Sequence, residues 1–442
     1  MEGGQSGVDP GQPAVGEGGL GIAVERLAMK VLHEAPFPPT SYGLVVSPGG
    51  GQVVFYQAAL GRVPSLATVP EGTARRLPNK GNAGQAAWSP DGEYLAYLST
   101  DEAQPEQWME MWLYSVSGGK LVGTVQLGRQ DIGSSQRGKV LADAHPTWTE
   151  DGKELHYLTL AGVYRVDRRE VDAAAGRQRD APTQAGSAAL RGRLVAKADA
   201  FPGEMQWLTR GPVAWAGGGR LLAFYSEDRR GDGATDQILW VVDEGGELVA
   251  RVPTRISGEG WPGGDLLSWC PDGRRLAWVS TPDAHQDPEA GTQPNACSDA
   301  GVQAAADRLS ILDVGSGRVA GFLSGLGDRR VRLQGWSPDG SRLALLVSPG
   351  TGGGWNLWLV RVPGATAPGS LAPAPGGNPN PLPAPGGASV PSPPTGSASG
   401  PFEPIVAQVW DDEKLREARW LAPDRLLALT ADDRLLVLQV GQ

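Results

Sequence analysis

The chain has 442 residues, of which 40% are hydrophobic, and it contains 15 Trp, 64 Gly and 37 Pro. A sizeable core is therefore available, while Gly and Pro at this level predict many tight turns between short strands. The formal net charge of -10 argues against partners such as nucleic acid or an anionic membrane surface, which select basic proteins.

The N-terminal residues 1–19 are polar and Gly-rich, and they predict a flexible leader. They have neither the basic start nor the apolar run of a signal peptide. Two locations stay open: the cytoplasm, or a periplasmic or other extracytoplasmic space if an export signal was removed. The segment Gly16 to Gly21 matches the dinucleotide-binding pattern G-x-G-x-x-G. Because Gln, Pro and Gly precede it instead of a strand, we attribute this match to composition.

An apolar run covers residues 20–32, ahead of the first sequence repeat. We expect it to be the outer strand of the last repeat, where it would seal an otherwise exposed sheet edge. A helix is the alternative, because Glu25 to Leu32 tolerates helical structure.

A short pattern recurs along the chain: an anchor residue, a tight turn and a β-rich run. The clearest copy is Trp88-Ser-Pro-Asp-Gly, which leads to Leu95-Ala-Tyr97. In every copy Leu or Val follows the anchor after seven residues, and an aromatic residue or Leu follows it after nine. The anchors are Val46, Trp88, Trp148, Trp215, Trp269, Trp336 and Trp420.

Each copy predicts a β-hairpin. Pro presets φ for the turn, the Asp side chain caps it, and Gly supplies a positive φ. Because the turn aspartates recur at equivalent positions, we expect them to form turns and to have no catalytic role; they are Asp91, Asp151, Asp272 and Asp339.

Further apolar runs supply a third and a fourth strand for most copies. Met111–Val116 is a third strand, and Lys120–Val125 and Gln206–Thr209 are fourth strands. Four antiparallel strands repeated seven times indicate an all-β, seven-bladed β-propeller. We expect it to form one domain over residues 20–442, closed by the N-terminal strand.

The sequence Trp-Ser-Pro-Asp-Gly followed by Leu-Ala-aromatic resembles the repeat of the TolB-like, WD-repeat-like propellers. Glu227 to Asp232, ahead of Ile238, resembles a hairpin of the same family. The resemblance extends over residues 40–440 and is specific for fold, not for function. It implies a partner-binding module of the bacterial cell envelope. The chain departs from TolB itself in its seven repeats and in showing no separate N-terminal domain, so the partners of TolB are not carried over.

Two insertions interrupt the repeats. Residues 170–203 are rich in Ala, Arg and Gly, and we expect them to be partly ordered. Residues 363–402 contain 12 Pro and no charged residue. This composition is typical of a solvated, disordered spacer, and it favours that reading over a proline-rich ligand.

We expect function on the face opposite the Pro-Asp-Gly turns, because the longer and more polar loops lie there. The candidate binding residues on that face are Trp108, His145, Asp265 and Arg332. Trp108 belongs to an aromatic and Met cluster that favours adaptable protein interfaces, with burial against the next blade as the alternative. The sequence thus predicts a non-enzymatic protein-binding or scaffold module without cofactor, metal, nucleic-acid partner or membrane insertion, and it leaves the oligomeric state open.

An enzyme with a site for a sugar or lactone-like molecule at the channel mouth is the alternative function. It requires several charged side chains that converge on one pocket. The candidates are His145, Asp265, Arg332 and Arg419. Charges that pair with their neighbours instead would count against an enzyme, and no G-x-S-x-G motif supplies a nucleophile.

His156 is the one residue that departs from the repeat, because the other copies have Ala or Val at its position. We expect it to be buried with a hydrogen-bond partner, while a ligand or proton role is the alternative. Cys270 and Cys297 are expected on opposite faces, and therefore as free thiols.

A calcium loop is suggested by Asp228, Asp232 and Asp236. Against the EF-hand template, however, Arg230 takes the third position and Leu239 the twelfth. We therefore expect a solvated hairpin tip at this place.

Overall fold

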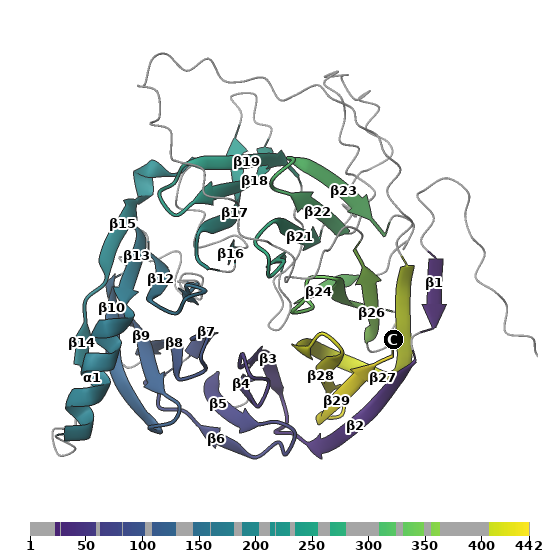
Figure 1. Ribbon diagram of the computed structural model, residues 1–442, viewed down its shortest axis with the longest axis horizontal. Coiled ribbons are helices and arrows are strands. Elements are labelled where there is room, and N and C mark those ends of the chain that lie inside the picture. The colour runs from purple at the N-terminus through teal and green to yellow at the C-terminus, as the bar shows by residue number, and fades with distance from the viewer. Residues whose placement is uncertain are drawn as a thin grey trace, which may run out of the picture.

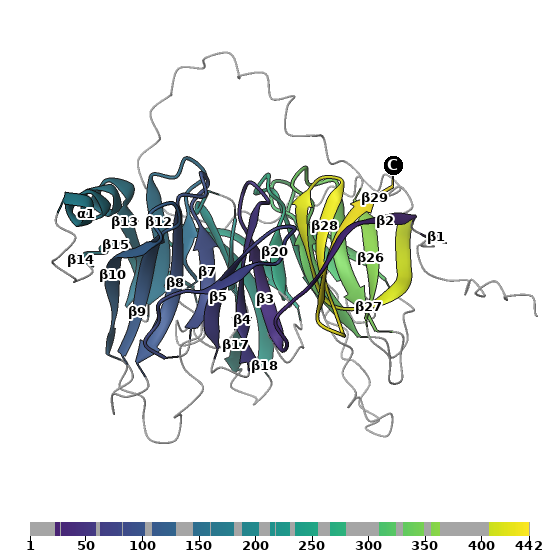
Figure 2. The same ribbon diagram turned by 90° about the horizontal axis from the view of Figure 1, so that it is seen from below.

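The computed structural model describes residues 23–26, 28–58, 62–81, 83–101, 108–129, 145–159, 161–180, 188–202, 213–216, 218–229, 235–254, 266–279, 309–323, 330–348, 355–362 and 406–441. Strands dominate these residues, as the repeats predict. In Figure 1 the sheets are arranged around one centre, with β3, β7, β16 and β24 toward it and β6, β15, β19 and β23 on the outside. In the perpendicular view of Figure 2 the strands run across the thickness of a disc.

Five separate blades each contain four antiparallel strands that pair in chain order. Blade 1 contains β3 (Ser41–Val46), β4 (Gln52–Gln57), β5 (Val63–Thr68) and β6 (Ala74–Arg76). Blade 2 contains β7 (Ala83–Trp88), β8 (Tyr94–Asp101), β9 (Trp108–Ser115) and β10 (Lys120–Arg129). Blade 3 contains β11 (Thr147–Trp148), β12 (Glu154–Thr159), β13 (Gly162–Asp167) and β15 (Arg193–Lys197). Blade 4 contains β16 (Val213–Trp215), β17 (Leu221–Arg229), β18 (Thr235–Asp243) and β19 (Leu248–Pro253). Blade 5 contains β20 (Leu267–Trp269), β21 (Arg275–Val279), β22 (Leu309–Asp313) and β23 (Arg318–Phe322).

The remaining strands form one eight-stranded sheet, so the described residues form five separate blades where seven were predicted. Its members include β24 (Val331–Trp336), β25 (Arg342–Val347), β26 (Trp355–Arg361), β27 (Val406–Ala422), β28 (Arg425–Thr430) and β29 (Arg434–Val440). Strand β27 joins β24–β26 to β28 and β29 within this sheet. It is 17 residues long, and it pairs with β26 near its start and with β28 near its end.

The N-terminal apolar run forms strands and not the alternative helix. The first strand, β1 (Ala23–Arg26), lies parallel to β27. The second, β2 (Met29–Pro36), is antiparallel to β29, from Met29 opposite Val440 to Pro36 opposite Arg434. The outer strand of the large sheet therefore extends to Pro36, four residues beyond the expected end at Leu32.

The insertion after residue 170 contains regular structure that the sequence analysis did not resolve. Helix α1 (Arg168–Asp180) buries Val171, Ala174 and Ala175 in the core between blades 2 and 3. After it, β14 (Ala188–Leu190) lies parallel to β10. Strand β15 then takes the place that was expected for Gln206–Thr209, so that assignment was wrong. Residues 203–212 and the Pro-rich segment 363–402 lie outside the described residues.

The anchor residues lie at the ends of the first strands, and pairing within each hairpin explains their spacing. In blade 2, Trp88 lies opposite Leu95 in the β7–β8 pair, seven residues later. Trp269 lies opposite Leu276 in the same way. The seven-residue spacing is therefore the length of one hairpin, measured from the anchor to its partner across the turn.

Four of the anchor tryptophans also join each blade to the one before it. Each donates its indole Nε1–H to the carbonyl of the residue that precedes the previous anchor. The pairs are Trp88 to Val45 (3.0 Å), Trp269 to Ala214 (2.9 Å), Trp336 to Ser268 (3.1 Å) and Trp420 to Gly335 (3.1 Å). The buried indole N–H groups of Trp148 and Trp215 have no partner among the described residues. This recurrent bond is therefore missing on both sides of blade 3.

The turn aspartates make the hydrogen bonds that a turn requires. Asp91 accepts the hydroxyl of Ser89 at 2.6 Å and the backbone N–H of Glu93 at 3.0 Å. Asp272 likewise accepts the N–H of Arg274 at 2.9 Å. Because successive strands are antiparallel, the turns that join the first and second strands of the blades lie on one face, which we call the turn face.

Buried Glu417 connects the large sheet to blade 1. Its carboxylate, on a side chain that is 2% exposed, accepts the N–H groups of Gly43 and Leu44, both at 2.8 Å. The β3–β4 pairing has an irregularity between Tyr42 and Val45, so these two N–H groups are turned away from β4. Gly43 has a φ of 67°, a conformation that favours glycine.

Replacing Glu417 with Gln should lower the free energy of unfolding by about 3 kcal/mol. The amide presents an N–H₂ group where the carboxylate accepts two N–H groups, and it leaves the Arg419 guanidinium, 3.1 Å away, without its counter-ion. Urea denaturation measures the change, with the exposed Glu71→Gln as the matched control. Equal stabilities for the two variants would show that this contact does not hold blade 1 to the large sheet.

Candidate functional site

The four predicted site residues do not come together as one described cluster. Trp108 begins β9 and pairs through its backbone with Asp101 and Arg129. Asp265 lies outside the described residues, as do most of the loops on the face that the sequence analysis favoured. A binding role for Trp108 and Asp265 therefore stays a prediction.

His145 links blades 2 and 3. Its backbone N–H donates to the side-chain oxygen of Gln85 at 2.8 Å, and its Nδ1 lies 3.2 Å from the amide nitrogen of Gln85. Both residues lie three positions before their anchors, and both have a positive φ, 39° for His145 and 25° for Gln85. Burial lowers the pKa of His145 to about 4, so its ring is neutral near pH 7 and accepts the amide N–H.

The two arginines proposed for an enzymatic site are engaged by their neighbours. The Arg332 guanidinium lies 3.9 Å from the ring centroid of Trp355, and burial, together with Arg330, lowers its pKa. Arg419 pairs with Glu417 and donates to the carbonyls of Leu44 at 3.0 Å and Gln334 at 3.1 Å. These contacts engage both guanidinium groups, and they count against the enzyme alternative.

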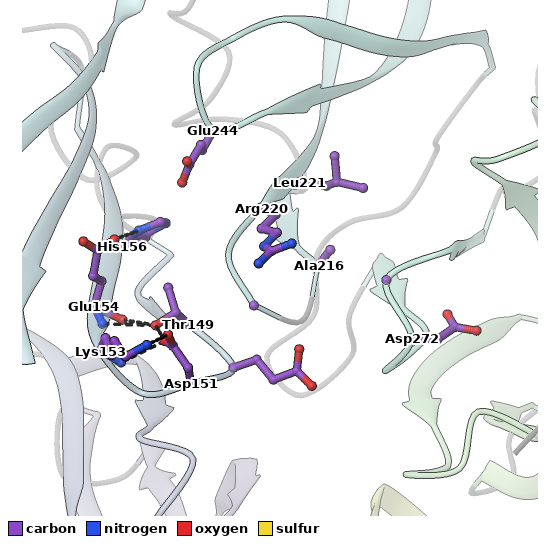
Figure 3. Close-up of a pocket in the computed structure, with 13 residues that line it drawn as sticks. Thr149, Asp151, Lys153, Glu154, His156, Ala216, Arg220, Leu221, Glu244 and Asp272 are labelled. Carbon is purple, nitrogen blue, oxygen red and sulfur yellow. Dashed lines mark hydrogen bonds and ion pairs between the residues drawn. The ribbon is translucent and has the colours of Figure 1, made fainter. Parts of the chain in front are cut away.

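A recess on the turn face is a candidate site that described residues line. It has a volume of about 770 Å³ and lies where the turns of blades 3, 4 and 5 meet (Figure 3). The lining from blade 3 is Thr149, Glu150, Asp151, Lys153, Glu154 and His156; blade 4 contributes Ala216, Gly218, Arg220, Leu221 and Glu244, and blade 5 contributes Asp272 and Gly273. The sequence analysis missed this recess.

The recess exists because the turn of blade 4 carries almost no side chains. Where blades 2 and 5 have Pro-Asp-Gly, this turn reads Ala216-Gly-Gly-Gly219. Its N–H···O bond from Gly219 to Ala216 is kept at 3.0 Å, with Gly218 and Gly219 at φ values of 87° and 67°. The turn therefore keeps this bond, but Gly218 has a positive φ where Asp91 and Asp272 do not, and the Pro and Asp side chains of the other turns are missing. The Gly triplet was the sequence signal for it.

His156 forms the inner wall of the recess and has the packing role expected for it. The side chain is 1% exposed, and its Nδ1 lies 3.2 Å from the carbonyl oxygen of Gly219 in blade 4. Its Nε2 lies 3.2 Å from a carboxylate oxygen of Glu154. The edge of the Trp215 ring packs on it at a centroid distance of 5.8 Å. His156 therefore fills the junction of blades 3 and 4, where the indole–carbonyl bond is missing.

The charged side chains of the recess fall into two groups. Three carboxylates are neutralised by adjacent cations: Asp151 by Lys153 (2.7 Å), Glu154 by Arg165 (2.8 Å) and Asp272 by Arg275 (3.3 Å). A second group has no hydrogen bond or ion pair through its side chains within the described part of the chain; it consists of Glu150, Arg220 and Glu244.

Two of the carboxyl groups in the recess have a displaced pKa, and both are displaced downward. The hydrogen bond from the Lys153 ammonium group, with further bonds from the Lys153 N–H and the Thr149 hydroxyl, lowers the pKa of Asp151 to about 2. Burial alone would raise the pKa of Asp272, but the N–H of Arg274 and the charge of Arg275 outweigh it. Both groups are therefore held as anions near pH 7, which suits charge recognition and not proton transfer.

The described residues give no sign of a metal centre or a reactive thiol. They contain no group of three or more His, Cys, Asp and Glu side chains placed to hold a metal ion. Cys270 is a free, buried thiol, and burial raises its pKa to about 11. Cys297 lies outside the described residues. A search of the described helices finds none with the length and apolarity to span a membrane.

Comparison with known proteins reveals no family model and no curated protein that matches the chain. Among solved structures it is similar to the β-propeller domain of Cps50 (Swd1) from Myceliophteria thermophila, with 11% identity, a TM-score of 0.47 and coverage of 94% of this chain and 100% of that one. A chain of the mitotic checkpoint complex matches with 11% identity, a TM-score of 0.48 and coverage of 100% and 99%. The propeller of the trilobed protease from Pyrococcus furiosus matches with 13% identity, a TM-score of 0.44 and coverage of 91% and 96%. At these values none of the matches supports an inference about function.

The carboxyl group of Asp151 should titrate with a midpoint of about 2. The pKa of Asp151 in the folded protein lies below the ordinary 3.8. The ion pair with Lys153 is therefore intact above pH 3.8 and is lost as the pH falls through about 2. Replacing Lys153 with Met should move the midpoint upward toward 3.8, whereas Lys30→Met, far from the recess, should not. Carboxyl ¹³C NMR titration measures the midpoint. An unchanged midpoint in Lys153→Met would show that this lysine does not hold the charge of Asp151.

Proposed function

We propose that this protein is a non-enzymatic, protein-binding propeller that receives part of a partner polypeptide in the turn-face recess. The observation that carries the proposal is the recess of about 770 Å³, which is lined by charged side chains, three of them without a side-chain partner among the described residues. Its turns are held by backbone and Asp hydrogen bonds, so the site is largely preformed and little ordering is needed on binding.

The chemistry of the recess supports binding more than catalysis. A general acid or base requires a pKa near the working pH, and enzymes reach it by raising carboxyl values or lowering those of lysines. The pKa values of the Asp151 and Asp272 carboxyl groups are instead lowered. Among the described histidines, the one with a lowered pKa is His145, and its ring nitrogens lie 3.2 and 3.4 Å from the amide nitrogen of Gln85.

The proposal includes an architecture of seven blades. The eight-stranded sheet contains two anchors, Trp336 and Trp420, each followed by its own hairpin, and β27 supplies strands to both halves. We regard these halves as the sixth and seventh blades. The pairing of β2 with β29 and the bonds of Glu417 to blade 1 support a closed ring.

A location in the bacterial cell envelope also belongs to the proposal, and the likeness of the repeats to TolB-like propellers is its support. Immunoblotting of periplasmic, membrane and cytosolic fractions of the native host tests it. Recovery in the cytosolic fraction alone would contradict the proposed envelope location. It would not contradict the proposed binding function.

A photo-crosslinking residue at position 247 tests the proposed function. Glu247 is exposed and follows the Asp243–Gly246 turn that carries Glu244, so a probe there faces the rim without removing a charge of the recess. The same residue at position 71, in an outer turn of blade 1, is the matched control. In extract of the native host, a discrete crosslinked protein should appear for position 247 and not for position 71.

Mass spectrometry of the crosslinked band should identify one polypeptide and a defined contact segment. The same products at both positions would indicate non-specific contact. No crosslinked product from any host fraction would contradict a protein-binding role for this recess.

A further inference from the structure

The outer strands of three blades and of the large sheet share one irregularity. In β10, β15, β19 and β2 an extra residue forms a bulge in the pairing with the neighbouring strand. Among the described residues, the exposed large apolar side chains all lie on three of these strands; they are Val31, Leu32, Leu194, Leu248 and Val249. Because a strand at the edge of a sheet has unpaired N–H and C=O groups, these edges are suited to receive another strand.

In blade 2 the chain itself covers the bulged edge. Strand β14 lies outside β10 (Figure 1) and runs parallel to it, from Ala188 opposite Gly123 to Leu190 opposite Val125. The bulge residue of β10, Val122, is 0% exposed and lies in one core cluster with Leu190. A bulged edge of this propeller therefore accepts a parallel strand directly after the bulge, and its apolar bulge residue is then buried.

The outer edge of blade 4 has the same bulge but no covering strand within the described residues, because β19 is the last strand of its sheet. Its bulge residue, Val249, is 43% exposed, and Leu248 before it is 50% exposed. Residues 250–252 occupy the positions of residues 123–125, the part of β10 that binds β14. In blade 3, by contrast, the bulge residue Val195 packs against a core cluster. Blade 4 therefore offers the kind of edge that β14 covers in blade 2.

Arg251 determines the charge of the strand that fits this edge. Its position corresponds to that of Thr124, which lies opposite the middle residue of β14. The side chain of Arg251 is exposed, with its guanidinium group 5.4 Å from the ring centroid of Trp240. At the same position of β2, Glu34 is already bound by Arg434 at 2.9 Å. Because opposite charges on paired residues stabilise neighbouring strands, the edge of blade 4 favours an acidic residue opposite Arg251.

We propose that the outer edge of blade 4 binds a short extended segment of a partner protein, which adds to β19 as a parallel strand. The segment carries one acidic residue, opposite Arg251, between two apolar residues. The second apolar residue packs on Val249, as Leu190 packs in one core cluster with Val122 in blade 2. Main-chain hydrogen bonds supply the affinity in such strand addition, and the side chains supply the specificity. No residue of β19 lines the turn-face recess, so this surface is separate from the proposed function.

The size of the second apolar residue follows from a comparison of the two edges. A Cβ on Gly123 would lie 2.7 Å from the Cδ1 atom of Leu190, so the leucine uses the space that this glycine leaves. Ala250, at the corresponding position of β19, has that Cβ. A shorter, β-branched residue such as valine therefore suits the segment that binds blade 4.

The test uses the full chain and three fluorescein-labelled peptides. The first is Gly-Ser-Val-Glu-Val-Ser-Gly, the second has Lys in place of Glu, and the third is the Glu peptide with both Val amide nitrogens methylated. Fluorescence anisotropy in 150 mM salt, roughly physiological, limits long-range attraction. The Glu peptide should bind at least about threefold more tightly than the Lys peptide. It should bind at least about tenfold more tightly than the methylated peptide, which lacks the N–H donors of a strand.

Two matched variants separate the edge of blade 4 from overall charge. Arg251→Glu should reverse the preference, so that the Lys peptide binds more tightly than the Glu peptide. The control is Arg75→Glu, at an exposed arginine on the outer strand β6 that lies 5.7 Å from the ring centroid of Tyr114. Either replacement changes the net charge from -10 to -12, since one positive charge is lost and one negative charge is gained. The control should keep the preference of the unmodified chain. Amide hydrogen exchange read by mass spectrometry locates the peptide, and the Glu peptide should protect residues 248–253.

Equal affinity of the Glu peptide and its methylated form would overturn the proposal, because contact would then be apolar and without strand pairing. The same change of preference in both arginine variants would overturn it too, because binding would follow net charge alone. Protection away from β19, or no binding of the Glu peptide up to about 1 mM, would show that this edge does not receive such a strand. None of these results bears on the turn-face recess, and a partner crosslinked at position 247 that is retained in Arg251→Glu belongs to the recess.

Discussion

Cohesion between neighbouring blades depends on one repeated interaction, the bond from an anchor indole N–H to the backbone carbonyl of the preceding blade. A sheet of four short strands cannot bury both of its faces alone, so each blade is stable only against its neighbours. The anchor ring fills the space between two sheets, and its N–H fixes one sheet against the other at about 3 Å. This bond gives a buried N–H donor and a backbone carbonyl their hydrogen-bond partners at the same time. It therefore fixes the orientation of each blade against the preceding one, in addition to the packing of the ring.

Where this bond is absent, the structure uses other contacts, and the candidate site lies there. At the junction of blades 3 and 4, His156 takes the position that a small residue has in the other copies. The Trp215 ring packs on it without the indole N–H···O bond of the other anchors. Arg168 of α1 covers the outer part of the same region, pairing with Asp91 and Glu93 and lying 4.4 Å from the ring centroid of Tyr94. Blade 3 is therefore held from outside by the inserted helix and from inside by a histidine. The turn of blade 4 could lose its side chains without loss of the fold, and a charged recess results.

Much of the fold could be predicted from the sequence, because the repeat reports local geometry. An anchor and the residue seven positions later face each other across a hairpin, so their spacing follows from strand pairing alone. The large sheet could not be predicted in this way, because it depends on how far β27 continues after pairing with β26. The fourth strand of blade 3 was misplaced because α1 and β14 intervene, and apolar content alone does not distinguish β15 from the run at 206–209.

The candidate site was harder to predict, because the sequence search looked for side chains that carry chemistry, whereas the recess is defined by missing ones. The Ala216–Gly219 turn was recognised as a copy of the repeat, but its lack of Pro and Asp was not read as open space. Contacts such as Glu417 with Gly43 and Leu44 join residues that are more than 370 positions apart, and no local pattern encodes them.

NMR of the chain labelled with ¹⁵N-tryptophan tests the central claim most directly, with each indole signal assigned by a Trp→Phe variant. The indole N–H protons of Trp88, Trp269, Trp336 and Trp420 should resonate downfield with small temperature coefficients, as hydrogen-bonded protons do. Those of Trp148 and Trp215 should lack both features. If all six signals behaved alike, blade 3 would be bonded like its neighbours, and the account of why the recess forms beside it would be contradicted.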